Sequence, residues 1–484
     1  MQPDTQKKTN YRWYICSLLF FATTINYLDR QVLSLTWKDF IVPEFHWTDS
    51  DYGTITGLFS IFYAISMAFA GRFVDWMDTK KGFLWAIGIW SIGACLHAYC
   101  GIATSGILAG EWFVGFEQAR HIIGGVDNVA RIASVSVALF IFARFVLAVG
   151  EAGNFPAAIK ATAEYFPKKD RAFSTSIFNA GATVGALAAP ITIPRLAAAY
   201  GWEASFIIIG ALGFLWMGFW IFMYKKPNQH PSVNAAELAY IQQDHATDAA
   251  VQAASGNATH DRMSFAACLK YRQTWAFAVG KFMTDGVWWF FLFWTPAYLS
   301  SVYGIKSSDP KGQFAVFVLY AITLLSIIGG WLPSYFVVKK GMNPYAGRMK
   351  AMLIFAFIPL VAVFAQPLGK HTYWLPIIII GIACAAHQAW SANIFSTVGD
   401  MFPRKAIATI TGFGGMAGGV GSFIINKGSG VLFDHAHNTG MTLMGFHGRE
   451  AGYFIIFCIC AVAYLIGWTI MKSLVPVYKP ITDL

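Results

Sequence analysis

Two acid–base pairs lie inside stretches of the sequence that are otherwise almost wholly apolar. Asp29 is next to Arg30, and Arg144 precedes Glu151 by seven residues. A charged side chain near the centre of a bilayer costs at least ~2.5 kcal/mol, so chains keep one there only where it faces a polar cavity, a partner or a substrate. These residues favour a protein that moves an ion or a charged solute across a membrane.

The composition predicts an all-α membrane protein. Of 484 residues, 56% are hydrophobic and only 12% are charged, whereas a soluble domain carries about 25% charged residues. Apolar runs of ~20 residues are long enough to span as helices and too long for the strands of a barrel. We expect twelve spans, at residues 13–37, 52–76, 82–101, 132–160, 172–198, 203–224, 272–302, 312–338, 347–366, 373–399, 407–432 and 451–474.

The formal net charge of +10 does not indicate a nucleic-acid partner, because the basic residues gather in alternate loops. That pattern is the positive-inside rule of multi-pass proteins in the lipid bilayer. It predicts that both termini face the cytoplasm. The first apolar run has no A-x-A-like site after it, so we expect no cleaved signal peptide.

The two halves of the chain contain similar segments. Gly71–Gly82 lines up with Gly330–Gly341, and Glu164–Lys169 lines up with Asp400–Lys405. Parallel repeats of six spans are a transporter architecture. We therefore expect an N-terminal six-helix bundle, a cytoplasmic linker and a C-terminal six-helix bundle, at residues 1–224, 225–270 and 271–484.

The second pair of repeats lies closer together along the chain than the first, which predicts an insertion in the first half. The polar residues 102–131 are the candidate, on the extracytoplasmic side, and their role stays open. In the linker, Asn234 with Glu237 three residues later is typical of a capped short helix.

Two of these motifs carry a family resemblance. Asn26–Arg30 (NYLDR) resembles the first-helix signature of the anion:cation symporters within the major facilitator superfamily. Arg144–Ala157 resembles the fourth-helix motif of the same group. Gly71–Gly82 is similar to the superfamily's loop between spans two and three, although Asp78 and Thr79 replace its usual glycine and basic residue.

The resemblance extends over nearly the whole chain. Within the symporters, Ala158–Ala172 and Ala385–Pro403 resemble bacterial hexuronate transporters. The resemblance implies the major facilitator fold and proton-coupled symport of a sugar acid, such as galacturonate or glucuronate, across the inner membrane by alternating access. It implies no cofactor beyond the proton gradient, and we expect a monomer.

Other functions stay open or are disfavoured. The nearest alternative is a symporter of another organic anion, an aldonate, aldarate or aromatic acid, with sodium as the coupling ion. A membrane-embedded enzyme would need a reactive constellation, and no nucleophile triad or metal-ligand spacing stands out. An anion channel is disfavoured by the repeated halves.

The four charges have different expected roles. Arg30 is the candidate for binding a substrate carboxylate, because a guanidinium donates two parallel hydrogen bonds; the alternative is that it only neutralises Asp29. The family resemblance implies that Asp29 and Glu151 are the protonation sites. Arg144 lies about 10 Å from Glu151 along a helix, so it would tune Glu151 at a distance or belong to a fixed charge network.

Polar and aromatic residues complete the candidate substrate site. Tyr27 and Tyr63 could bind hydroxyls, and on the tenth span Gln388 and Asn393 could do the same while Trp390 covers a sugar ring. Packing is the alternative for each of these residues. His387, also on the tenth span, is either a proton carrier or a buried histidine satisfied by a neighbour.

Four further features are weaker signals. Pro156 predicts a bend beside Glu151. Lys281 and Asp285, four residues apart, read more readily as a neutralising pair than as a site. Trp288 and Trp289 are candidates for a cavity wall. The glycine-rich run 412–422 is better explained by close helix packing than by nucleotide binding.

Overall fold

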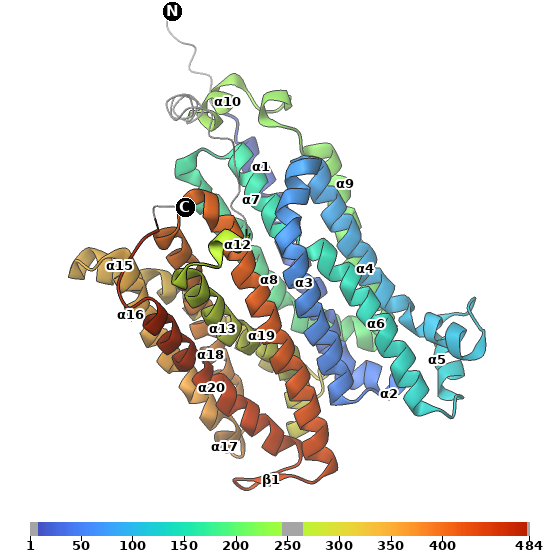
Figure 1. Ribbon diagram of the computed structural model, residues 1–484. Helices are drawn as coiled ribbons and strands as arrows, with labels where there is room; N and C mark the ends of the chain where they lie inside the picture. Colours follow the sequence, from blue (N-terminus) through green and yellow to red (C-terminus); the bar gives the residue numbers. More distant parts are fainter. Residues whose placement is uncertain (1–7, 244–264, 482–484) are drawn as a thin grey trace, which may run out of the picture.

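The computed structural model describes residues 8–243 and 265–481, and this part of the chain is almost entirely helical (Figure 1). The helices of the N-terminal half are α1 (Tyr11–Thr36), η1 (Trp37–Ile41, a π-helix), α2 (Val42–Phe45), α3 (Asp49–Met77), α4 (Thr79–Ala109), α5 (Phe116–Gly124), α6 (Val129–Glu151), α7 (Asn154–Tyr165), α8 (Lys168–Tyr200), α9 (Trp202–Met223), η2 (Pro227–Gln229) and α10 (Ala235–Ile241).

The C-terminal half adds further helices and one β-hairpin. These elements are α12 (Phe265–Cys268), α13 (Arg272–Tyr303), α14 (Pro310–Ile322), η3 (Thr323–Ile327), α15 (Ile328–Lys340), α16 (Pro344–Phe357), η4 (Ile358–Phe364), α17 (Ala365–Gly369), α18 (Trp374–Met401), α19 (Arg404–Asn438), β1 (Thr442–Leu443), β2 (Phe446–His447) and α20 (Arg449–Leu474). The two strands pair antiparallel. We call the end of the molecule that carries this hairpin, with α2 and α5, the hairpin end (Figure 1).

Every expected span coincides with one long helix or with consecutive helical pieces. Nine segments of the described chain are long and apolar enough to cross a membrane. The other three expected spans are α1, α13 and α19, which carry charges such as Arg30, Lys281 and Lys427. These three helices meet at the junction of the halves, because α1 packs on α13, α13 on α19, and α19 on α3. The least apolar helices therefore lie inside the molecule.

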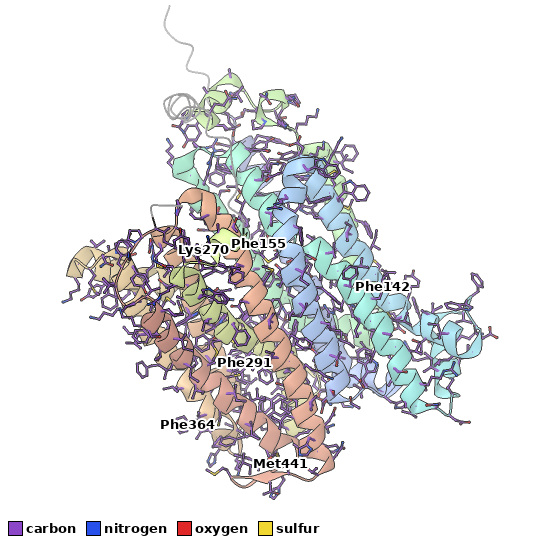
Figure 2. All side chains as sticks on the ribbon, viewed as in Figure 1. Phe142, Phe155, Lys270, Phe291, Phe364 and Met441 are labelled. Carbon is purple, nitrogen blue, oxygen red and sulfur yellow. The ribbon has the colours of Figure 1, made fainter. Side chains whose placement is uncertain are left out.

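Aromatic side chains cover the outer flanks, as a lipid-facing surface requires. Phe142 and Phe364 lie on opposite flanks and are 58% and 56% exposed, whereas Phe291 is buried inside the C-terminal half (Figure 2). The exposed rings fit contact with hydrocarbon chains rather than with water. The assignment of residues 1–224 and 271–484 to two separate bundles stays a prediction.

The helix of the fourth span breaks where Pro156 predicted a bend. Helix α6 ends at Glu151 and α7 begins at Asn154, so the interruption covers Ala152, whose carbonyl the proline ring opposes. Just before it, a side chain at Gly150 would collide with the backbone of α4. This glycine lets α6 approach α4 closely and fixes the position of Glu151.

The insertion is shorter than the sequence predicted, and it contains the helix α5. Helix α4 continues to Ala109 and α6 begins at Val129, so both helices enter the predicted segment 102–131. Between them, Arg120 of α5 docks the insertion onto α9 and α2. Its Nη2 donates to Glu203 Oε1 at 2.7 Å, and its Nε lies 3.3 Å from Glu44 Oε2.

The start of the linker has the predicted cap. The side chain of Asn234 accepts a hydrogen bond from the backbone N–H of Glu237 at 2.9 Å. Arg12 forms an ion pair of 3.0 Å with Glu237, which ties α10 to the start of α1. Residues 244–264 of the predicted linker lie outside the described residues.

The insertion dock predicts a pH-dependent stability. Burial raises the pKa of Glu44 from 4.5 to about 7. Between about pH 4.5 and pH 7, the folded protein therefore keeps a proton on Glu44 that the unfolded chain has already released. The contribution of this proton to the free energy of unfolding is lost as the pH rises through about 7. We expect Glu44→Gln to flatten, by a few degrees, the fall in melting temperature of the detergent-purified protein between about pH 5 and pH 8. Glu111→Gln, at an exposed carboxyl of the insertion, is the control; a wild-type slope in Glu44→Gln would contradict the assignment.

Candidate functional site

An ion pair between α1 and α6 forms the centre of the site. Arg30 donates to Glu151 Oε2 from Nη2 at 2.6 Å and from Nε at 2.9 Å. The two side chains are only 4% and 0% exposed. The partner of Arg30 is thus Glu151, not its neighbour Asp29, because adjacent residues on a helix point about 100° apart.

Aromatic rings from both halves of the chain enclose the Arg30 guanidinium. Its Cζ lies 5.2 Å from the ring centre of Tyr27, 4.8 Å from that of Tyr63 and 4.9 Å from that of Trp289. Each of these distances allows a cation–π interaction. The structure therefore brings Tyr27 and Tyr63 to Arg30, and it identifies Trp289 as the tryptophan that faces this cation.

The other two charges of the cluster are buried and unpaired among the described residues. Asp29 is 2% exposed, Arg144 is 1% exposed, and neither the Asp29 carboxylate nor the Arg144 guanidinium has a hydrogen-bond partner there. Both lie within electrostatic range of Glu151, whose Oε1 is also without a partner. Buried charges without hydrogen bonds are costly, so these groups keep a hydrogen-bonding capacity that the described residues do not use.

Three buried amides that the sequence reasoning left out of the site belong to the same helices. Asn26 and Gln31 lie on α1 and Asn154 begins α7, and in all three the amide atoms lack a partner among the described residues. Each amide can both donate to and accept from a hydroxyl group. The criterion that identified Arg30, a polar side chain within an apolar span, would also have identified these three residues.

The candidates on α18 have partners inside the C-terminal half. Trp390 is fully buried and lies edge-on to Tyr464 of α20, with ring centres 5.6 Å apart. Asn393 donates to the carbonyls of Gly329 and Ala389, both at 2.8 Å. Gln388 is half-buried. The structure thus engages Trp390 and Asn393 in packing, and their expected role in substrate binding stays a prediction.

His387 is satisfied by its neighbours. Its Nδ1 lies 2.7 Å from the hydroxyl of Tyr464, and its ring stacks on Trp288 with centres 5.3 Å apart. This arrangement matches the alternative of a buried, satisfied histidine. It also shows that Trp288 and Trp289 point to different partners, the first to His387 and the second to Arg30.

A polar network closes the junction of the halves at the hairpin end. The carboxylate of Asp434 on α19 accepts from the backbone N–H groups of Asp49 at 3.0 Å and Ser50 at 2.7 Å, so it caps α3 from the other half. Arg449 donates to Asp49 Oδ2 at 2.6 Å, and Lys427 donates to Ser50 Oγ at 2.7 Å. Sequence reasoning missed these residues, although Lys427 lies inside the expected span 407–432.

A second contact joins the halves beside this network. Asp39, in the π-helical segment η1, accepts from Ser300 Oγ and from the backbone N–H of Ser307, both at 2.6 Å. Helix α1, which carries Arg30, runs directly into η1. The closed end and the central ion pair are therefore connected through one continuous stretch of chain.

The buried pair predicts non-additive stabilities. Removing one partner of a buried ion pair leaves an uncompensated charge and costs about 3–5 kcal/mol, whereas apolar replacement of both partners is often neutral. We expect Arg30→Met to lower the free energy of unfolding by that amount, and Arg30→Met/Glu151→Leu to recover most of it, measured by denaturation in detergent. Arg348→Met, which breaks the more exposed pair with Asp400, should cost about 1 kcal/mol or less. Equal losses in the single and double variants would contradict the pairing.

Comparisons with known proteins show which transporters this chain is similar to. The hexuronate transporter of Escherichia coli (strain K12) is 26% identical over 476 residues, which cover 97% of this chain and 96% of the relative. The probable galactarate/D-glucarate transporter of the same organism is 24% identical over 449 residues, with 91% and 92% of the two chains covered.

A solved structure has the same fold. A bacterial homologue of the human lysosomal transporter Spinster, in an inward-facing and occupied conformation, superposes with a TM-score of 0.65 at 18% identity and covers 97% of both chains. The sequence profile of the Major Facilitator Superfamily matches residues 19–425. The chain therefore belongs to the Major Facilitator Superfamily and is a membrane transporter of small molecules, not an enzyme.

Proposed function

We propose that this transporter is a proton-coupled symporter that imports a sugar acid, such as galacturonate or glucuronate, across the inner membrane by alternating access. The observation that carries the proposal is the Arg30–Glu151 pair, enclosed by aromatic rings from both halves. The similarity to transporters of hexuronates and of sugar diacids supports the substrate class.

The ion pair couples an anion to a proton. The Glu151 carboxylate occupies the hydrogen-bonding edge of Arg30, and a substrate carboxylate needs the same edge for two parallel hydrogen bonds. A proton on Glu151 removes its negative charge and releases Arg30 to the substrate. The charge inside the membrane then stays balanced, because one proton enters with each carboxylate.

The surrounding groups have matching roles in the proposal. Asp29, unpaired among the described residues and within electrostatic range of Glu151 and Arg144, is a second position that the same proton can occupy, and Arg144 sets the charge around both acids. The hydroxyls of Tyr27 and Tyr63 bind sugar hydroxyls. Trp289 covers one face of the sugar ring, since an aromatic face packs against the C–H groups of a pyranose.

Alternating access requires the hairpin end to open. The contacts of Asp434, Arg449 and Lys427 across the junction are part-buried hydrogen bonds and ion pairs, and water can take their place when the halves part. The two halves could therefore separate there without loss of their internal packing. The distribution of basic residues among the loops supports a cytoplasmic position for both termini. All residues of the proposed site come from one chain, which supports a monomer.

Gradient-driven uptake tests the coupling role of Glu151. We expect wild-type proteoliposomes to accumulate labelled galacturonate when the outside is more acidic. The Glu151→Gln variant should accumulate at least about tenfold less, because glutamine cannot take up and release the coupling proton. This variant should still exchange external for internal substrate. Glu117→Gln, at an exposed carboxyl of α5, should behave as the wild type.

The same vesicles distinguish the coupling ions. Full accumulation by Glu151→Gln under the pH gradient would remove Glu151 from the coupling mechanism. Uptake that requires a sodium gradient and ignores an imposed pH gradient in sodium-free buffer would replace proton coupling with the sodium-coupled alternative.

A thermal-shift screen tests the substrate class. A ligand at about 100 times its dissociation constant stabilises the folded state by roughly 2.7 kcal/mol. We expect uronates to raise the melting temperature of the purified protein by several degrees and Arg30→Lys to abolish most of that shift, because a lysine cannot donate the paired hydrogen bonds of a guanidinium. Stabilisation by aromatic acids or aldonates alone would favour the other organic anions.

A further inference from the structure

The C-terminal half carries its own buried cation–carboxylate pair. Lys281 Nζ lies 2.7 Å from Asp285 Oδ2, with side chains that are 7% and 15% exposed. Both residues belong to α13, four positions apart. The sequence reading of this pair as simple neutralisation leaves open why two charges are kept inside a membrane span.

Packing does not explain the pair. Burying an ion pair costs several kcal/mol per ion before attraction is counted, and apolar replacement is often neutral or stabilising. An ion pair can still be useful where it ties two helices together, but Lys281 and Asp285 lie on the same helix. Their pairing adds no link between helices, so the two charges need another reason to be there.

The neighbouring helices leave room for the pair. A side chain at Gly418 of α19 would collide with the Asp285 carboxylate, so the glycine makes space for it. On α18, the ring centre of Phe395 lies 4.3 Å from Lys281 Nζ. The titratable groups that face the pair are His387 of α18, within electrostatic range of Lys281, and Tyr464 of α20, within range of Asp285.

The pair lies in line with the central site. Lys281, Asp285 and Trp289 follow one another at spacings of four residues and so share one face of α13. Trp289 lies over Arg30, and Lys281 is about 12 Å from Trp289 along the helix axis. One face of α13 thus leads from the fixed cation of the N-terminal half to a second cation.

We propose that Lys281 binds a second carboxylate of the substrate and so admits sugar diacids. A sugar diacid binds with one carboxylate on Arg30 and the other on Lys281. This inference rests on the proposed function, because it assigns the first carboxylate to Arg30. It extends the substrate class from uronates to aldarates.

The second carboxylate needs a proton of its own. In the empty site, the Lys281 ammonium is paired with the Asp285 carboxylate. A proton from the aqueous phase forms an O–H bond on Asp285, the Lys281–Asp285 ion pair breaks, and the ammonium pairs with the substrate carboxylate. One proton therefore enters with each carboxylate, on Glu151 and on Asp285, and the net charge of the site does not change. A uronate uses only the first of these two exchanges.

The test compares galacturonate with galactarate, which carries one more carboxylate on the same carbon skeleton. We expect Lys281→Gln to weaken binding of galactarate to the purified protein by at least about tenfold, since it removes a hydrogen-bonded charge partner, and to change galacturonate binding by less than twofold. Lys370→Gln, at an exposed lysine of the hairpin end, should affect neither ligand. No loss of galactarate binding in Lys281→Gln, or an equal loss for both ligands, would overturn the inference.

A second variant does not depend on the folding of Lys281→Gln. In the wild type, the ratio of galactarate to galacturonate affinity should rise as the pH falls from about 8 to 6, because Asp285 must take up a proton. In Asp285→Asn that ratio should stay constant and high; a wild-type pH response would contradict the proposal. A wild type that binds galacturonate but no galactarate refutes the inference alone, whereas a wild type that binds neither refutes the proposed function.

Discussion

The buried pair of Arg30 and Glu151 constrains the rest of the molecule. In a medium of low dielectric constant, neither charge can change partner or protonation state alone without a large energetic cost. The helix break after Glu151 and the close contact of Gly150 with α4 hold the acid in place. The rings of Tyr63 and Trp289 hold the cation. In the proposed mechanism, anion binding and proton binding are therefore linked by electrostatics before any conformational change is considered.

The membrane-spanning helices could be predicted from the sequence more closely than the segments outside the membrane. Hydrocarbon requires apolar helices of fixed length, so every span was found, although α4 and α19 end at Ala109 and Asn438, beyond their predicted ends at residues 101 and 432. Pro156 marked the break in the fourth span. Helix α4 extends beyond its predicted end, where the hydroxyls of Thr104 and Ser105 donate to carbonyls of their own helix and are satisfied within it. Residues 102–109 (IATSGILA) are themselves mostly apolar, so the prediction ended the span too early by grouping them with the polar residues that follow.

Site residues could be recognised by type, but their partners could not. The Arg30–Glu151 contact joins residues far apart in the sequence and depends on the rotation of two helices about their axes, which periodicity leaves undetermined. For the same reason Asn393 looked available for a substrate, yet the carbonyl of Gly329 on α15 satisfies it. The residues that close the hairpin end were missed because Asp49 and Arg449 resemble ordinary charges at helix ends.

The two polar systems differ in a way that fits alternating access. At the hairpin end, the Arg449–Asp49 pair is only part-buried, with side chains that are 28% and 4% exposed, so water can take its place once the halves begin to part. The central pair is dry, so its rearrangement requires a compensating charge. Asp39 and Arg30 lie on one continuous stretch, α1 with its π-helical end, and π-helical turns are frequent at functional sites. In the proposed mechanism, a movement that opens the hairpin end therefore also moves the helix that carries Arg30, and access to the site then depends on whether Arg30 is paired with Glu151 or with the substrate.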